Sequence, residues 1–197
     1  MKKDKMYEVY KDYLLEVNNH TNLTSITNPE EIQTKHFEDS LSVIDFISKG
    51  DKVLDIGSGA GFPGIPLRIE KDFDLTLIDS VNKKVKFMNE VIEKLGLEDT
   101  RAIHTRAEDF AKKDRETYDI VVSRAVANMS TLSELCIPFL KVGGSFIAMK
   151  GPRADEELKE ASNALKVLGG EVRKIERFNL DGNERVNIVA VSYTHLR

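Results

Sequence analysis

Residues 53–67 read VLDIGSGAGFPGIPL, and this stretch decides the fold. A short apolar run typical of a buried strand leads into Gly57, Gly59, Gly61 and Gly64 and then into helical spacing. Glycines at a strand-to-helix turn permit a left-handed backbone and let a flat ligand approach without a Cβ in the way. A simple connector needs one or two glycines, so four indicate a ligand-binding loop.

The chain around this loop alternates apolar runs with helical patterns. Runs typical of strands occur at 53–56, 75–79, 101–104, 118–123 and 145–150. Helical spacing occurs at 81–96, 130–144 and 154–168. Such alternation predicts an α/β fold with a parallel sheet and helices on both faces. Residues 171–180 and 184–193, separated by Asp-Gly-Asn, predict a closing antiparallel hairpin.

The chain before the first strand is helical in pattern. Apolar residues at three- and four-residue steps predict an amphipathic helix over 5–18, and Asn28 is placed to cap a second helix from Pro29 to Ser48. We expect residues 1–50 to form a helical extension packed on a core domain of residues 51–191. Residues 192–197 are a tail without functional weight, which an expression or assembly scar would explain.

Composition excludes several classes of protein. The 197 residues carry 29 Lys and Arg against 33 Asp and Glu, so no global basic field favours nucleic acid, and any polyanion must be held by a local patch. No apolar run approaches the roughly 20 residues that a membrane span needs. The single cysteine, Cys136, lies in an apolar helical run and is interpreted as a core thiol. We expect a cytoplasmic protein with no membrane partner.

The ligand of the glycine loop has two candidate identities. Gly59, Gly61 and Gly64 also satisfy the G-x-G-x-x-G pattern of a dinucleotide fold, and Asp79 ends the next strand, where a ribose-binding acid belongs. However, Asp55 places a carboxylate where it would repel a pyrophosphate and attract the ammonium of a methionine moiety. Residues 107–109 read Ala-Glu-Asp and can read an adenine amino group, and the hairpin is not the second half of a dinucleotide fold. These features favour S-adenosylmethionine.

With these residues the chain resembles the seven-stranded S-adenosylmethionine-dependent methyltransferases. More narrowly it resembles the family of rRNA small subunit methyltransferase G, also called glucose-inhibited division protein B. The matching motifs are NLT at 22–24, HFEDSL at 36–41, DIGSGAGFPGIPL at 55–67, LIDSVNKKVKFMNEV at 77–91, RAED at 106–109, VVSRAVA at 121–127 and KG at 150–151. The resemblance implies a Rossmann-like seven-stranded, mostly parallel sheet.

The resemblance also implies transfer of a methyl group from S-adenosylmethionine to N7 of one guanine in 16S rRNA. The partner is then 16S rRNA or the small ribosomal subunit, and we expect the enzyme to act as a monomer. Positions that match the family's cofactor contacts are Gly57, Phe62, Ala107, Glu108 and Arg124, and Asp79 is added from the usual ribose contact of the fold. Family members often continue into a basic tail with Tyr-Pro-Arg, which this chain lacks. If that tail holds RNA, we expect cofactor binding to exceed RNA binding.

The chemistry of N7 methylation needs alignment rather than a general base, because N7 already carries a lone pair. Arg124 ends the fourth predicted strand, where ligands of open α/β sheets bind, or it pairs with an acid such as Glu108. Lys150 ends the fifth strand and is placed to meet an RNA phosphate, or it is a surface lysine.

His36 and Asp39 lie three residues apart on one helix face. The resemblance places this motif near the cofactor, and we interpret the two as a hydrogen-bonded pair at the rim of the site. The remaining histidines show no metal-ligand spacing, so we expect no metal site. Two other functions stay open: a small-molecule methyltransferase, and a module that binds an adenosyl ligand without catalysis.

Overall fold

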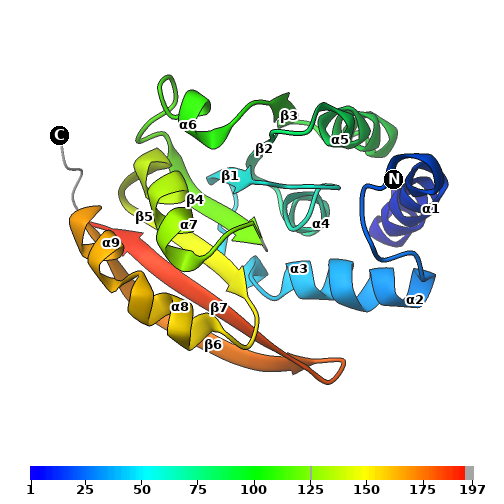
Figure 1. Ribbon diagram of the computed structural model, residues 1–197. Coiled ribbons are helices and arrows are strands. Elements are labelled where there is room, and N and C mark those ends of the chain that lie inside the picture. The colour runs from blue at the N-terminus through cyan, green and yellow to red at the C-terminus, as the bar shows by residue number, and fades with distance from the viewer. Residues whose placement is uncertain (125, 194–197) are drawn as a thin grey trace.

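The computed structural model describes residues 1–124 and 126–193, and strands in these ranges form one sheet of seven with the order β3-β2-β1-β4-β5-β7-β6 (Figure 1). The strands are β1 (Lys52–Ile56), β2 (Asp74–Asp79), β3 (Thr100–His104), β4 (Tyr118–Arg124), β5 (Leu140–Lys150), β6 (Gly170–Leu180) and β7 (Asn183–Ser192). The first five are parallel, and β7 pairs antiparallel with both β5 and β6. This confirms the predicted fold class and the terminal hairpin.

Helices cover both faces of the sheet. The face that holds the larger buried cluster is covered by α1 (Lys3–Thr21), α2 (Pro29–Ile32), the π-helical η1 (Gln33–Glu38), α3 (Asp39–Leu41), the 3₁₀ turn η2 (Ile44–Phe46), α4 (Gly64–Glu70) and α5 (Asn82–Leu95). The other face is covered by α6 (Ala107–Phe110), α7 (Met129–Cys136), the 3₁₀ turn η3 (Ile137–Phe139), α8 (Ala154–Glu160) and α9 (Ser162–Val167). In the described ranges, none of these helices is long and apolar enough to span a membrane.

The second predicted helix begins as expected but ends early. Asn28 caps it by accepting from the backbone N–H of Glu30 at 2.8 Å. The helical run then passes through the π turn and stops at Leu41, seven residues before the predicted end at Ser48. The Ser42 hydroxyl donates to the carbonyl of Asp39 at 2.7 Å and so competes with continued helical bonding.

The helix predicted over residues 130–144 is also too long. It ends at Cys136, and β5 already begins at Leu140. Pro138 lies inside the run, and proline lacks the N–H that a continuing helix needs. Over so few apolar residues, the pattern of a helix cannot be distinguished from the pattern at the beginning of a buried strand. The helix predicted over 154–168 is present as two short helices, α8 and α9.

Helix α1 is fastened to the glycine loop by Tyr10. This ring is fully buried, stacks on Phe62 with a centroid separation of 5.3 Å, and donates its hydroxyl proton to the carbonyl of Ala60. Burial raises the pKa of the Tyr10 phenol, so the hydroxyl remains a donor. The N-terminal segment is thus part of the scaffold that holds the loop.

Removal of this hydroxyl tests that role. Tyr10→Phe leaves the Ala60 carbonyl without its partner, so we expect the free energy of unfolding to fall by about 1–2 kcal/mol. Tyr13→Phe is the matched control, because its hydroxyl bonds Glu90 at the surface, and it should cost less than about 0.5 kcal/mol. Urea denaturation measures both, and equal losses would contradict the assignment.

Candidate functional site

The glycine loop links β1 to α4, and Gly57, Gly61 and Gly64 leave no room for a side chain. Gly57 has φ +71°, and a Cβ there would lie 2.4 Å from Cγ2 of Val126. A Cβ on Gly64 would lie 2.8 Å from Oδ2 of Asp55. The loop therefore packs closely over the end of β1. Its backbone faces the cavity that opens over the ends of β1, β2 and β3.

Asp55 lies beneath this loop and is completely buried. Its Oδ2 accepts from the N–H of Gly64 at 2.8 Å, whereas Oδ1 is buried without a hydrogen-bond partner in the described residues. Burial raises the pKa of the Asp55 carboxyl from 3.8 to about 7, against a smaller opposing effect of the Gly64 N–H. The unpaired Oδ1 is the acceptor available to a cationic ligand group, and its contact with the methionine ammonium stays a prediction.

Asp79 ends β2 and supports the loop from the neighbouring strand. Its Oδ2 accepts from the N–H of Gly59 at 3.0 Å, and its Oδ1 accepts from the N–H of Val81 at 2.8 Å. Each carboxylate oxygen has a second lone pair, so both remain able to accept from a ribose hydroxyl. The N–H of Gly59 is thus bound by Asp79, and the predicted contact of Gly59 with the cofactor stays a prediction.

A cavity of about 440 Å³ opens over the ends of β1, β2 and β3, and we call it the glycine-loop cavity. Of the predicted cofactor positions, its lining includes Gly57, Asp79, Ala107, Glu108 and Arg124. Its size falls in the range of cofactor sites. Phe62, Asp55 and Gly59 are not part of the lining and lie behind it.

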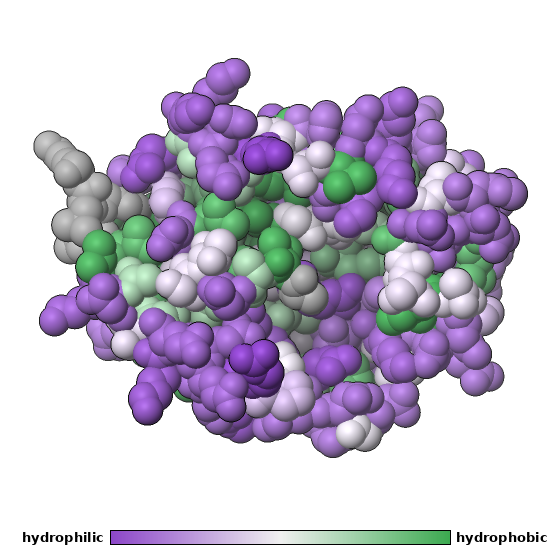
Figure 2. Space-filling model, viewed as in Figure 1, coloured by the Kyte–Doolittle hydropathy of each residue, from purple (hydrophilic) through white to green (hydrophobic). Residues whose placement is uncertain are grey.

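A second cavity of about 570 Å³ lies over the ends of β4 and β5, and we call it the arginine cavity. It is lined by Ile26, Lys35, His36, Asp39, Arg124, Val126, Ala127, Met149, Lys150, Gly151, Glu157, Arg185 and Asn187. The two cavities share Arg124 and Val126. Figure 2, viewed in the same direction as Figure 1, shows hydrophobic surface toward the middle of the molecule and hydrophilic side chains around it.

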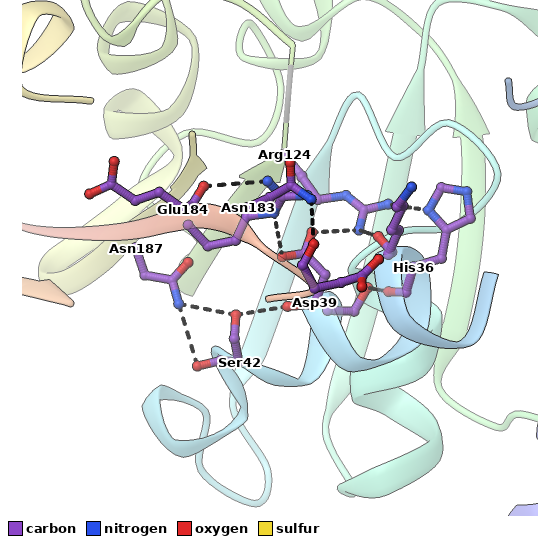
Figure 3. Close-up of polar contacts among 11 residues, drawn as sticks. His36, Asp39, Ser42, Arg124, Asn183, Glu184 and Asn187 are labelled. Atoms are coloured by element: carbon purple, nitrogen blue, oxygen red, sulfur yellow. Dashed lines mark hydrogen bonds and ion pairs between the residues drawn. The ribbon is translucent and has the colours of Figure 1, made fainter. Parts of the chain in front are cut away.

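Arg124 is held at this junction by the π-helical turn (Figure 3). Its Nη1 donates to Oδ2 of Asp39 at 3.0 Å and to the carbonyl of Lys35 at 3.2 Å, and its Nη2 donates to Nδ1 of His36 at 3.1 Å. The guanidinium also lies 5.2 Å from the ring centroid of Phe62. The alternative that Arg124 pairs with an acid is confirmed, but the acid is Asp39 and not Glu108, because the strand alternation turns Arg124 toward the helices of the N-terminal segment.

His36 is a neutral part of this cluster. Burial lowers its pKa from 6.5 to about 3, with a smaller contribution from the Arg124 charge. Because Nδ1 accepts from Arg124, the ring proton lies on Nε2 and is donated to Oγ1 of Thr24 at 2.9 Å. The ring stacks on Phe62 at 4.3 Å. His36 and Asp39 were expected to bond each other, and instead Arg124 joins them.

Several residues of the arginine cavity, among them Glu157 and two polar residues of β7, were not predicted from the sequence. Arg185 donates from Nε to Oδ1 of Asp39 at 3.3 Å. Asn187 donates to the hydroxyl of Ser42 at 3.0 Å (Figure 3). Both lie on β7, and two-residue alternation puts them on the same face as each other. Polar residues at alternate positions, ahead of the apolar run at 188–191, were the available signal.

Lys150 differs from its predicted open position. Its side chain is only 5% exposed, and its Nζ lies 2.7 Å from Oε2 of Glu157 and donates to the carbonyl of Ala127. The lysine is therefore already paired, which leaves little of its charge for an RNA phosphate. Cys136 is fully buried, and burial raises the pKa of its thiol well above 9.0, which agrees with the core interpretation.

Comparison with known proteins fits this arrangement. The model of the rRNA small subunit methyltransferase G family matches residues 3–187. The chain belongs to this family. It is 49% identical over 183 residues to ribosomal RNA small subunit methyltransferase G of Clostridium perfringens, covering 90% of this chain and 77% of that protein. It is 51% identical over 197 residues to the protein of the same name from Desulforamulus reducens, covering 95% and 82%.

Membership in the family confirms the predicted enzyme class and cofactor: the chain is an S-adenosylmethionine-dependent methyltransferase. Among solved structures, a putative S-adenosyl-L-methionine-dependent methyltransferase from Methanococcus maripaludis has a TM-score of 0.64 at 18% identity, covering 85% of this chain and 91% of that one. A putative transferase from Pyrococcus horikoshii has a TM-score of 0.67 at 16% identity, covering 80% and 63%. At these identities the structures show the shared fold.

The raised pKa of Asp55 predicts how stability depends on pH without cofactor. The neutral form is favoured by folding, so its contribution is full below pH 3.8 and is lost as the pH rises through about 7. The free energy of unfolding of the wild type should therefore fall between pH 5 and pH 8. Asp55→Asn keeps an acceptor for the Gly64 N–H but does not titrate, so this fall should be much smaller in the variant.

Urea denaturation at pH 5 and pH 8 measures this effect. Asp109→Asn serves as the control, because Asp109 is an exposed surface carboxylate, and this variant should keep the trend of the wild type. The same decline in Asp55→Asn as in the wild type would contradict the assignment.

Proposed function

We propose that this chain transfers a methyl group from S-adenosylmethionine to N7 of a guanine in the 16S rRNA of the small ribosomal subunit. The observation that carries the proposal is the meeting of the two cavities at Arg124 and Val126. One cavity suits the cofactor and the other is large enough for a base, so donor and acceptor can meet between them. Family membership supports the ribosomal substrate.

The residues of the glycine-loop cavity fit the cofactor. Asp55 lies behind the lining with a buried carboxylate oxygen that has no partner among the described residues, and the absence of a Cβ at Gly57 lets the loop lie against Val126. We assign Asp79 to the ribose and the Ala107–Glu108 segment to the adenine. When bound, S-adenosylmethionine supplies a methyl group made electrophilic by its positively charged sulfur.

The residues of the arginine cavity are suited to alignment and not to proton abstraction. The Nδ1 lone pair of His36 is occupied by Arg124, and both carboxylate oxygens of Asp39 accept from arginines. The buried thiol of Cys136 is too far from ionisation to act as a nucleophile. A guanine N7 needs none of these, because its lone pair attacks directly, and orientation then supplies the main rate effect.

Two alternatives make different predictions. A small-molecule methyltransferase would favour an apolar acceptor pocket, whereas the arginine cavity is lined by Lys35, Asp39, Arg124, Lys150, Glu157 and Arg185. A non-catalytic module would bind the cofactor and transfer no methyl group. A ribosomal substrate also implies action in the cytoplasm, where we expect the enzyme to act as a monomer.

The proposal is tested by transfer of tritiated methyl groups to naked 16S rRNA, free small subunits and assembled ribosomes. Cleavage of the chain at N7-methylguanine then locates the label. We expect one labelled guanine in 16S rRNA. Label on an exocyclic nitrogen, label on a metabolite only, or cofactor binding without transfer would contradict the proposal.

Arg124→Ala tests the residue at the junction. Removal of the guanidinium breaks its hydrogen bonds to Asp39 and His36 beside the reacting atoms. We therefore expect kcat/KM to fall by about 100-fold or more. Arg153→Ala is the control, because Arg153 pairs with Glu156 at the surface and should change kcat/KM little. Thermal unfolding of both variants checks that the fold is kept. Unchanged kinetics in a folded Arg124→Ala would remove Arg124 from the site.

A further inference from the structure

The arginine cavity has two charged walls on opposite faces of the sheet. Arg124 and Arg185 belong to the face covered by the N-terminal helices, where both contact Asp39. Lys150 follows Phe146 and Ala148 on β5 by two-residue steps, and those residues pack in the cluster of the other face. Lys150 there meets Glu157 of α8. The methyl-transfer chemistry described above uses the first wall and leaves the second without a role.

Glu157 keeps one oxygen available. Its Oε2 accepts from the N–H of Met129 at 2.9 Å and lies 2.7 Å from Nζ of Lys150. Both contacts use the same oxygen, and no described residue donates a hydrogen bond to Oε1. Lys150 is almost completely buried, and its ammonium pairs with the Glu157 carboxylate at the cavity wall. Glu157 thus presents an anchored acceptor to whatever enters the cavity.

The shape of guanine determines which part of it meets this wall. N7 and O6 lie on one edge, while N1–H and the exocyclic amine on C2 are donors on the edges away from N7. If N7 faces the junction at Arg124 and Val126, these donors point into the cavity. They require an acceptor there, because buried unpaired donors are costly. Asp39, the other carboxylate of this lining, has each oxygen paired with an arginine, whereas Oε1 of Glu157 has no donor among the described residues.

We propose that Glu157, anchored by Lys150 and the start of α7, accepts hydrogen bonds from N1–H and the C2 amine of the target guanine and so sets the specificity for that base. The inference rests on the proposed function. Adenine would place its unprotonated N1 against the carboxylate, which repels it. Glu157 is a specificity-determining residue, and no proton or bond changes hands at it.

Inosine at the target position tests this role, because inosine keeps N7, O6 and N1–H and lacks only the C2 amine. Small subunits are reconstituted with 16S rRNA that carries guanosine or inosine at the methylated position. We expect the wild type to favour guanosine over inosine in kcat/KM by about tenfold or more. In Glu157→Gln, which retains an acceptor for Met129 and Lys150, the preference should fall to within about threefold of one.

Glu156→Gln is the matched control, because Glu156 neighbours Glu157 on α8, is exposed and pairs with Arg153. It should keep the preference of the wild type, and calorimetry should show unchanged cofactor affinity in both variants. A purely structural ion pair would lower both rates together without changing their ratio. An unchanged ratio in Glu157→Gln, or a wild type that accepts inosine as well as guanosine, would overturn the inference. Absence of N7 methylation by the wild type would instead overturn the proposed function.

Discussion

The contact of Arg124 with Asp39, His36 and the carbonyl of Lys35 is the constraint on which the rest of the site depends. Burial of a guanidinium at the end of a central strand is costly unless its N–H donors have hydrogen-bond acceptors. A single helical run supplies these acceptors. Its π-helical turn lies where Lys35 and His36 face β4. These contacts hold the Arg124 side chain in place before any ligand binds. They thereby fix the point at which the two cavities meet.

An aromatic layer connects this junction to the glycine loop. Phe62, on the loop, stacks between Tyr10 of α1 and His36, and Arg124 lies over the same ring. The N-terminal helix, the loop and the arginine therefore share one set of contacts. A change at any of them is transmitted to the others through packed side chains, which explains why a helical extension ahead of the core belongs to the site.

The local parts of this structure were accessible from sequence because local physics determines them. The strand-to-helix glycines, the Asn28 cap and the Asp181–Asn183 turn each have a signature within a few residues. The helix ends at Leu41 and Cys136 were missed, since a hydroxyl contact and a proline outweighed spacing. The partner of Arg124 was also missed, because Asp39 is 85 positions away and only the packing of a π-helical turn onto β4 brings them together. The roles of Arg185 and Glu157 depend on the same long-range geometry.

The central claim is that the glycine-loop cavity receives the cofactor and the arginine cavity receives the base. A crystal structure of the chain with S-adenosylmethionine tests it most directly. The account predicts the ribose at Asp79, the adenine at Ala107 and Glu108, and the methyl group directed past Val126 toward Arg124. A cofactor seated in the arginine cavity, or with its methyl group turned away from Arg124, would contradict it.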